Sequence, residues 1–144
     1  MHWIPLAIIT ATAFGAYNIF IKLSAGRIDE VLGAVILQVV AALLGGAYAI
    51  YLHFNGHHFP ISTKGTLLAV GAGVAIGIAE ILTFIVYSKG APASMATPII
   101  MGGSILIAAL IGVIALREGL GGMQLLGVGC VIAGVALISA FSPT

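Results

Sequence analysis

Five apolar runs, each about long enough to cross a lipid bilayer, dominate this sequence of 144 residues. A hydrocarbon core of about 30 Å takes roughly 20 residues of α-helix, and each run lies between short polar breaks. The sequence therefore predicts an all-α, polytopic bundle of five transmembrane helices that forms a single domain over residues 1–144. The expected helices cover residues 3–23, 31–54, 66–88, 93–116 and 123–141.

Composition restricts the function as much as the fold. Hydrophobic residues make up 61% of the chain and charged residues 6%, whereas a soluble domain has about a quarter charged residues. The net charge of +1 offers no basic surface for nucleic acid. No nucleophile elbow, phosphate loop or zinc-protease motif is present, so we expect neither an enzyme nor a bound cofactor.

Three histidines, His53, His57 and His58, could be taken for metal ligands because two of them are four residues apart. The intervening Asn55-Gly56 pair interrupts helical geometry, and no acidic residue stands nearby. We therefore expect a solvated loop near the headgroups and no metal site.

Glu80 is the one ionisable residue deep inside an expected membrane span. A charge at the middle of a bilayer costs at least about 2.5 kcal/mol, so such residues usually face a cavity or a partner and mark a solute or proton path. The alternative is a protonated carboxyl that makes one structural hydrogen bond between helices. A carboxyl in this setting could bind protons and a cationic solute in competition, so that proton inflow drives solute outflow.

Helical spacing places small, hydroxyl and aromatic residues on the same face as Glu80. On the first helix, a polar stripe approaches its C-terminal end; the amide of Asn18 needs a partner there, either solute or another helix. Lys22 is expected to extend toward the interface. The candidate site residues are Glu80, Gly77, Thr83, Phe84 and Tyr87 on the third helix, with Tyr17 and Asn18 on the first.

The fourth helix has features that favour a bend. Pro98 removes a backbone donor, and Gly102, Gly103 and Ser104 lie near the middle of the span. Bent helices often line transporter sites, but a proline in the first turns is also an ordinary feature of a helix start. Both interpretations stay open.

Small residues recur every four positions on four of the expected helices, as they do where helix backbones approach closely in membranes. Packing within one bundle accounts for such stripes without a specific dimerisation motif. The stripes contain Ala7, Ala11 and Gly15; Gly73 and Gly77; Ser104, Ala108 and Gly112; and Gly129 and Ala133.

The charges give almost no preferred orientation. Loops on the side of the N-terminus carry Lys64 and Arg117, and the opposite loops carry Lys22, Arg27 and Lys89. Since Lys and Arg asymmetry orients membrane proteins, the chain could insert either way. Two oppositely inserted copies would form an antiparallel homodimer of ten helices with an inverted repeat.

Three segments of the chain form a recognisable set: the stretch from Thr12 to Lys22, the Lys-Gly-Ala-Pro-Ala-Ser-Met-Ala stretch from Lys89, and the Leu-Arg-Glu-Gly-Leu-Gly-Gly-Met-Gln-Leu-Leu-Gly stretch from Leu116. Together they resemble the EamA-type domain of the drug/metabolite transporter superfamily. The resemblance implies ten-helix transporters made of two inverted halves, of which this chain is one, with a cavity lined mainly by the first four helices of each half. It also implies that Glu118 caps the last helix at its N-terminus.

The chain departs from that family pattern at two places. Gly102-Gly103-Ser104 stands where such domains often carry a proline a little later, and Glu80 is not an acid that the family motif requires. The importance of Glu80 therefore depends on the physical argument alone.

The sequence thus predicts an integral membrane protein, in the cytoplasmic membrane of a prokaryote, that exports a small or cationic solute by alternating access in exchange for protons. Its expected partners are the solute, protons, the lipid bilayer and a second copy of the chain. Two alternatives remain. One is a transporter of uncharged metabolites or amino acids, and the other is a non-transporting subunit that regulates a larger membrane partner.

Overall fold

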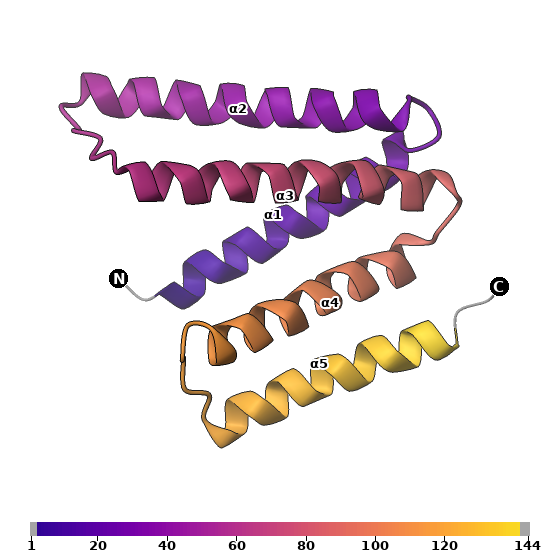
Figure 1. Ribbon diagram of the computed structural model, residues 1–144. Coiled ribbons are helices and arrows are strands. Elements are labelled where there is room, and N and C mark those ends of the chain that lie inside the picture. Colours follow the sequence, from indigo (N-terminus) through magenta and orange to yellow (C-terminus); the bar gives the residue numbers. More distant parts are fainter. Residues whose placement is uncertain (1–2, 142–144) are drawn as a thin grey trace. The chain divides into compact units, whose positions relative to one another are not determined.

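The computed structural model describes residues 3–141, and this part of the chain forms five α-helices (Figure 1). They are α1 (Trp3–Ser24), α2 (Glu30–Phe54), α3 (Thr63–Ser88), α4 (Ala93–Ile114) and α5 (Gly122–Ala140). All five are long and apolar enough to cross a membrane. The predicted all-α fold with five membrane-spanning helices is confirmed.

The helix boundaries differ most from the prediction at polar ends. The third helix begins at Thr63, three residues before the expected Thr66, because Ser62 caps it by accepting a hydrogen bond from the Gly65 amide at 3.1 Å. The fourth helix ends at Ile114, and shortly after it Arg117 adopts a left-handed backbone with a φ of 56°. A non-glycine residue in that conformation cannot continue a helix.

The predicted capping role of Glu118 is wrong. The last helix begins after Gly121, whose amide donates to the Gln124 side chain at 2.7 Å. Glu118 instead stays with α4: its amide donates to the Gly112 carbonyl at 3.0 Å, and its carboxyl lies over the Gly112 backbone. The acid therefore closes the C-terminal end of α4 and precedes α5 without capping it.

The chain divides into two compact units, residues 1–90 and 91–144, of which residues 3–90 and 91–141 are described. In the first unit, α3 contacts both α1 and α2. The second unit is the helical hairpin of α4 and α5.

Each unit has one place where a glycine lets a neighbouring helix come close. A Cβ added at Gly33 of α2 would stand 2.5 Å from Cε1 of Phe84 on α3, and Phe84 is only 3% exposed. In the second unit, a Cβ at Gly102 of α4 would collide with Val135 of α5. Both contacts fit the general use of small residues where membrane helices pack.

Packing within each of the two described units explains only part of the small-residue stripes. An added Cβ would meet Gln38 at Gly77 and Glu118 at Gly112, but nothing within 4 Å at Gly15, Gly73 or Gly129. Most large apolar side chains on the described helices are likewise exposed. In a membrane, such surfaces face lipid or further helices.

Candidate functional site

Glu80 lies well inside the longest helix of the first unit. It precedes the end of α3 at Ser88 by eight residues, or about 12 Å at the helical rise. The side chain is only 4% exposed, and among residues 3–141 its Oε2 atom has no hydrogen-bond partner. A buried carboxyl oxygen without a partner is costly, so this atom is suited to receive a proton or a cationic ligand.

Two further helices bring polar groups to the same part of α3. Tyr17 of α1 directs its hydroxyl to the carboxyl of Glu80. Gln38 of α2 lies against Gly77, where the amide nitrogen and oxygen would be 3.6 and 3.7 Å from an added Cβ. Since Gly77 precedes Glu80 by about one turn, a hydroxyl, an amide and a carboxyl converge from three helices.

Sequence reasoning missed Gln38. It is half-buried and is the only side-chain amide in the apolar interior of α2. Polar side chains inside membrane helices usually find a partner or face a cavity, so this isolated amide was itself a usable signal. The absence of a nearby acid or hydroxyl on α2 left it without a pattern to join.

Asn18 and Tyr87 form a second polar contact between α1 and α3. Each is 2% exposed, and the Tyr87 hydroxyl donates to Oδ1 of Asn18 at 3.5 Å. Nδ2 of Asn18 donates to the Phe14 carbonyl at 2.8 Å. The Asn18 side chain thus bonds both its own helix and α3, and its binding of a solute stays a prediction.

The Tyr87 ring already has a cation beside it. Nζ of Lys22 lies 5.7 Å from the ring centroid, within the range of a cation–π interaction. Lys22 is half-buried. This aromatic face is therefore occupied by the protein's own ammonium, whereas the Glu80 carboxyl has no such neighbour.

Thr83 and Phe84 line α3 next to Glu80 but have partners of other kinds. The Thr83 hydroxyl donates to the Ala79 carbonyl of its own helix at 2.7 Å. Phe84 packs on Gly33 of α2. The two residues shape the surroundings of the carboxyl, and neither presents a free polar group to it.

Comparison with known families gives a match over nearly the whole chain. The model of the EamA-like transporter family matches residues 1–140. The chain belongs to the EamA-like transporter family. It is therefore an integral membrane transporter, whose partners are a solute and the lipid bilayer, and enzymatic catalysis is not the activity of this family. No curated protein and no solved structure matches it in two further comparisons.

The expected bend residues of this EamA-like chain lie in the second unit. Pro98 falls in the second turn of α4, and the helix continues without a break from Ala93 to Ile114 (Figure 1). Gly102 faces Val135 of α5, whereas an added Cβ at Gly103 would meet nothing within 4 Å. The Ser104 hydroxyl donates to the Met101 carbonyl of its own helix at 2.8 Å. Gly102 thus has a packing role between the two helices of the hairpin.

The three histidines considered as metal ligands lie in the last turn of α2, at His53, and in the α2–α3 connection, at His57 and His58. His57 packs edge-on against Phe59, with ring centroids 5.0 Å apart. Across residues 3–141, no group of three histidine, cysteine or acidic side chains is arranged to hold a metal ion. The first-unit cluster around Glu80 is therefore the site on which a functional proposal can be built.

Proposed function

We propose that this chain is a proton-coupled exporter of a small cationic solute, with Glu80 as the group that binds the proton and the cation in turn. The observation that carries the proposal is the Oε2 atom of Glu80, which is buried on a helix long and apolar enough to cross a membrane and has no hydrogen-bond partner in the described part of the chain. Intramembrane acids in such positions mark ion and proton paths. If one carboxyl can hold either a proton or a cation, inward proton flow can drive outward solute flow.

The groups that face this carboxyl within residues 3–90 include no second acid. Tyr17 approaches from α1, Tyr87 follows two turns later on α3, and Lys22 lies beside the Tyr87 ring. From Val31 to Ala47, α2 carries no ionisable side chain, and Gln38 is its one polar contribution. Exchange of a proton for a monovalent cation at Glu80 would therefore leave the local charge unchanged.

The proposed assembly is a homodimer of two copies inserted in opposite orientations, in the cytoplasmic membrane of a prokaryote. The nearly balanced Lys and Arg tally of the loops supports dual insertion. The open surroundings of Gly15, Gly73 and Gly129 offer positions where further helices can approach. Finding C-terminal tags on one side of the membrane only, in cells that express a functional protein, would reject this arrangement.

Solute-induced proton release from the purified protein tests the mechanism. Weakly buffered protein in lipid nanodiscs should release protons when a transported cation is added, and Glu80→Gln should abolish the release. Glu118→Gln removes the acid beside Gly112 and provides the matched control, which should release protons like the wild type.

The outcomes separate the alternatives. A transporter of uncharged metabolites would transport without proton release and would retain transport in Glu80→Gln. A non-transporting subunit would give neither release nor transport in proteoliposomes made from this chain alone. Either result would overturn the proposed exchange.

A further inference from the structure

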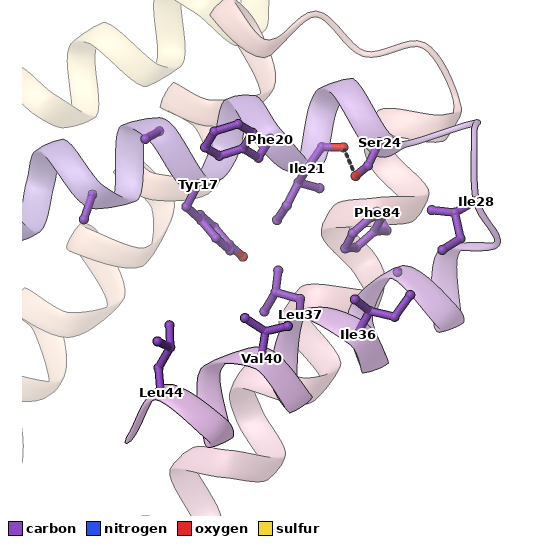
Figure 2. Close-up of a pocket in the computed structure, with 13 residues that line it drawn as sticks. Tyr17, Phe20, Ile21, Ser24, Ile28, Ile36, Leu37, Val40, Leu44 and Phe84 are labelled. Carbon is purple, nitrogen blue, oxygen red and sulfur yellow. Dashed lines mark hydrogen bonds between the residues drawn. The ribbon is translucent and has the colours of Figure 1, made fainter. Parts of the chain in front are cut away.

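The first unit contains an apolar groove with a volume of about 870 Å³, lined by α1, α2 and one residue of α3 (Figure 2). This volume falls within the range of pockets that bind drug-sized molecules. The lining is almost entirely aliphatic and aromatic, with Ala13, Ala16, Tyr17, Phe20, Ile21 and Ser24 from α1, Ile28 before α2, Gly33, Ile36, Leu37, Val40 and Leu44 from α2, and Phe84 from α3.

Two hydroxyl side chains line the groove, Ser24 and Tyr17, and only Tyr17 gives the groove a polar end. The Ser24 hydroxyl donates to the Ile21 carbonyl of its own helix at 3.0 Å, so it is already satisfied (Figure 2). The Tyr17 ring extends from α1 into the groove with its hydroxyl at the tip, and that hydroxyl interacts with the Glu80 carboxyl. Phe84, which lines the groove from α3, follows Glu80 by one helical turn. The apolar space therefore adjoins the acid through Tyr17.

We propose that this groove holds the hydrophobic body of an amphiphilic organic amine, whose ammonium group reaches Tyr17 and Glu80. This inference deepens the function proposed above and rests on Glu80 binding a cation. A bare small cation would leave the groove unused. A sugar or a polar amino acid would lose its hydrogen bonds to water and find only Tyr17 in exchange.

Charge complementarity selects the amine over other apolar occupants. No basic side chain lines the groove, and the nearby ammonium of Lys22 lies over the Tyr87 ring. An apolar anion would meet the Glu80 carboxyl, and a neutral apolar molecule would leave Oε2 of Glu80 without a partner. An amine with an aliphatic or aromatic body satisfies both parts of the site.

Three probes separate the contribution of the apolar part of the ligand from that of its charge. They are 4-phenylbutylammonium, its neutral analogue 4-phenylbutanol, and methylammonium. Binding to the full chain in nanodiscs is measured by proton release and by isothermal titration, with partition into lipid subtracted on Glu80→Gln protein. We expect the phenylbutyl amine to bind at least tenfold more tightly than either comparison probe. In an alkylamine series, each added methylene should improve the affinity about threefold to fourfold until the groove is filled.

A pair of α1 variants tests whether the apolar part of the amine binds in the groove. Ala16→Phe fills the groove from its wall and should weaken phenylbutylammonium binding tenfold or more, while methylammonium still releases protons. Ile19→Phe places the same ring on an exposed part of α1 outside the groove and should bind like the wild type. A thermal melt of each variant controls for folding.

The results distinguish a failure of this inference from a failure of the exporter mechanism. Proton release that depends on Glu80 but does not improve with an apolar body, or that is unaffected by Ala16→Phe, would overturn the groove proposal and keep the exchange. Equal binding of amine and alcohol would show a lipid-like apolar site and overturn the groove proposal, and no proton release by any probe would overturn both. Loss of dimers in Ala16→Phe without any probe binding would assign the groove to a second copy.

Discussion

The contact of α1 with α3 and the contact of α4 with α5 hold membrane helices together in different ways. The buried polar and charged side chains of the described residues are Asn18, Glu80 and Thr83, and all three belong to α1 or α3. The α4–α5 contact includes the close approach of a glycine and a valine, Gly102 and Val135. Small residues that let helix backbones approach are a common means of helix association in membranes, whereas buried ionisable groups such as Glu80 usually mark a solute or proton path.

The first unit itself combines both kinds of contact, because α3 meets α2 through Phe84 on Gly33 and α1 through polar groups. The apolar contact fixes the position of α3, and the polar contact carries the groups with possible chemistry. The two contacts can be tested separately by substituting their partners, Gly33 on α2 and Asn18 on α1.

The largest effect is expected for Gly33→Ala. Three atoms of the Phe84 ring would lie 2.5 to 3.0 Å from the new methyl group, and a buried ring cannot turn away easily. Overpacking of this kind costs about 1–3 kcal/mol, and we expect the upper part of that range in the free energy of unfolding. Titration with SDS in mixed micelles measures it. The control is Gly45→Ala on the same helix, where an added Cβ meets nothing within 4 Å; equal stability of the two variants would contradict the contact.

Gly102→Ala in the α4–α5 hairpin should lower the free energy of unfolding by less, about 1–2 kcal/mol. The colliding atom is Cγ2 of Val135, which a rotation about χ1 can partly move aside. Val135→Ala should restore much of the lost stability in the double variant. The control is Gly103→Ala, whose added Cβ has no neighbouring atom within 4 Å, and it should change the free energy of unfolding little. A double variant that is merely additive would show that the two side chains do not touch.

The sequence predicted the helices well because the thickness of the bilayer sets their length and polar residues mark their ends. It missed some polar ends by two or three residues: Thr63 and Lys64 begin α3, α4 ends before Arg117, and Glu118 does not cap α5. Those outcomes depend on local hydrogen bonds at Ser62 and Gly121 that the hydropathy pattern does not contain.

For the candidate site, helical spacing identified the residues that share a face on one helix, but it could not pair residues on different helices. The Asn18–Tyr87 bond joins positions 69 apart in the sequence, and Gln38 reaches the site only because α2 packs on α3. The proximity of Tyr17 to Glu80 follows from the same packing. The role of these residues in transport stays a prediction.

The hydrogen bond between Tyr87 and Asn18 should contribute less to stability than either of the two glycine contacts. The hydrogen bond from Tyr87 to Asn18 is long, at 3.5 Å, and comparable bonds in membrane proteins contribute about 0.6 kcal/mol on average. A double-mutant cycle of Asn18→Leu with Tyr87→Phe should give a coupling free energy of that size. The phenylalanine keeps a ring for Lys22, so the cycle isolates the hydroxyl. Coupling well above about 1.7 kcal/mol would indicate that this pair, and not Phe84 on Gly33, determines the position of α3.

The smallest effect is expected for Thr83→Val, although Thr83 is 93% buried and follows Glu80 by less than one turn. Its hydroxyl donates to the Ala79 carbonyl of the same helix, so an isosteric valine removes no contact with another helix or with the site. Stability should change by less than about 0.5 kcal/mol, and proton release by a transported amine should stay within about twofold of the wild type. A tenfold loss of amine binding in Thr83→Val, with stability unchanged, would mean that the hydroxyl turns to the ligand during transport. The polar site would then extend from Tyr17 and Glu80 along α3, and the division between positioning and ligand-binding residues on that helix would have to be redrawn.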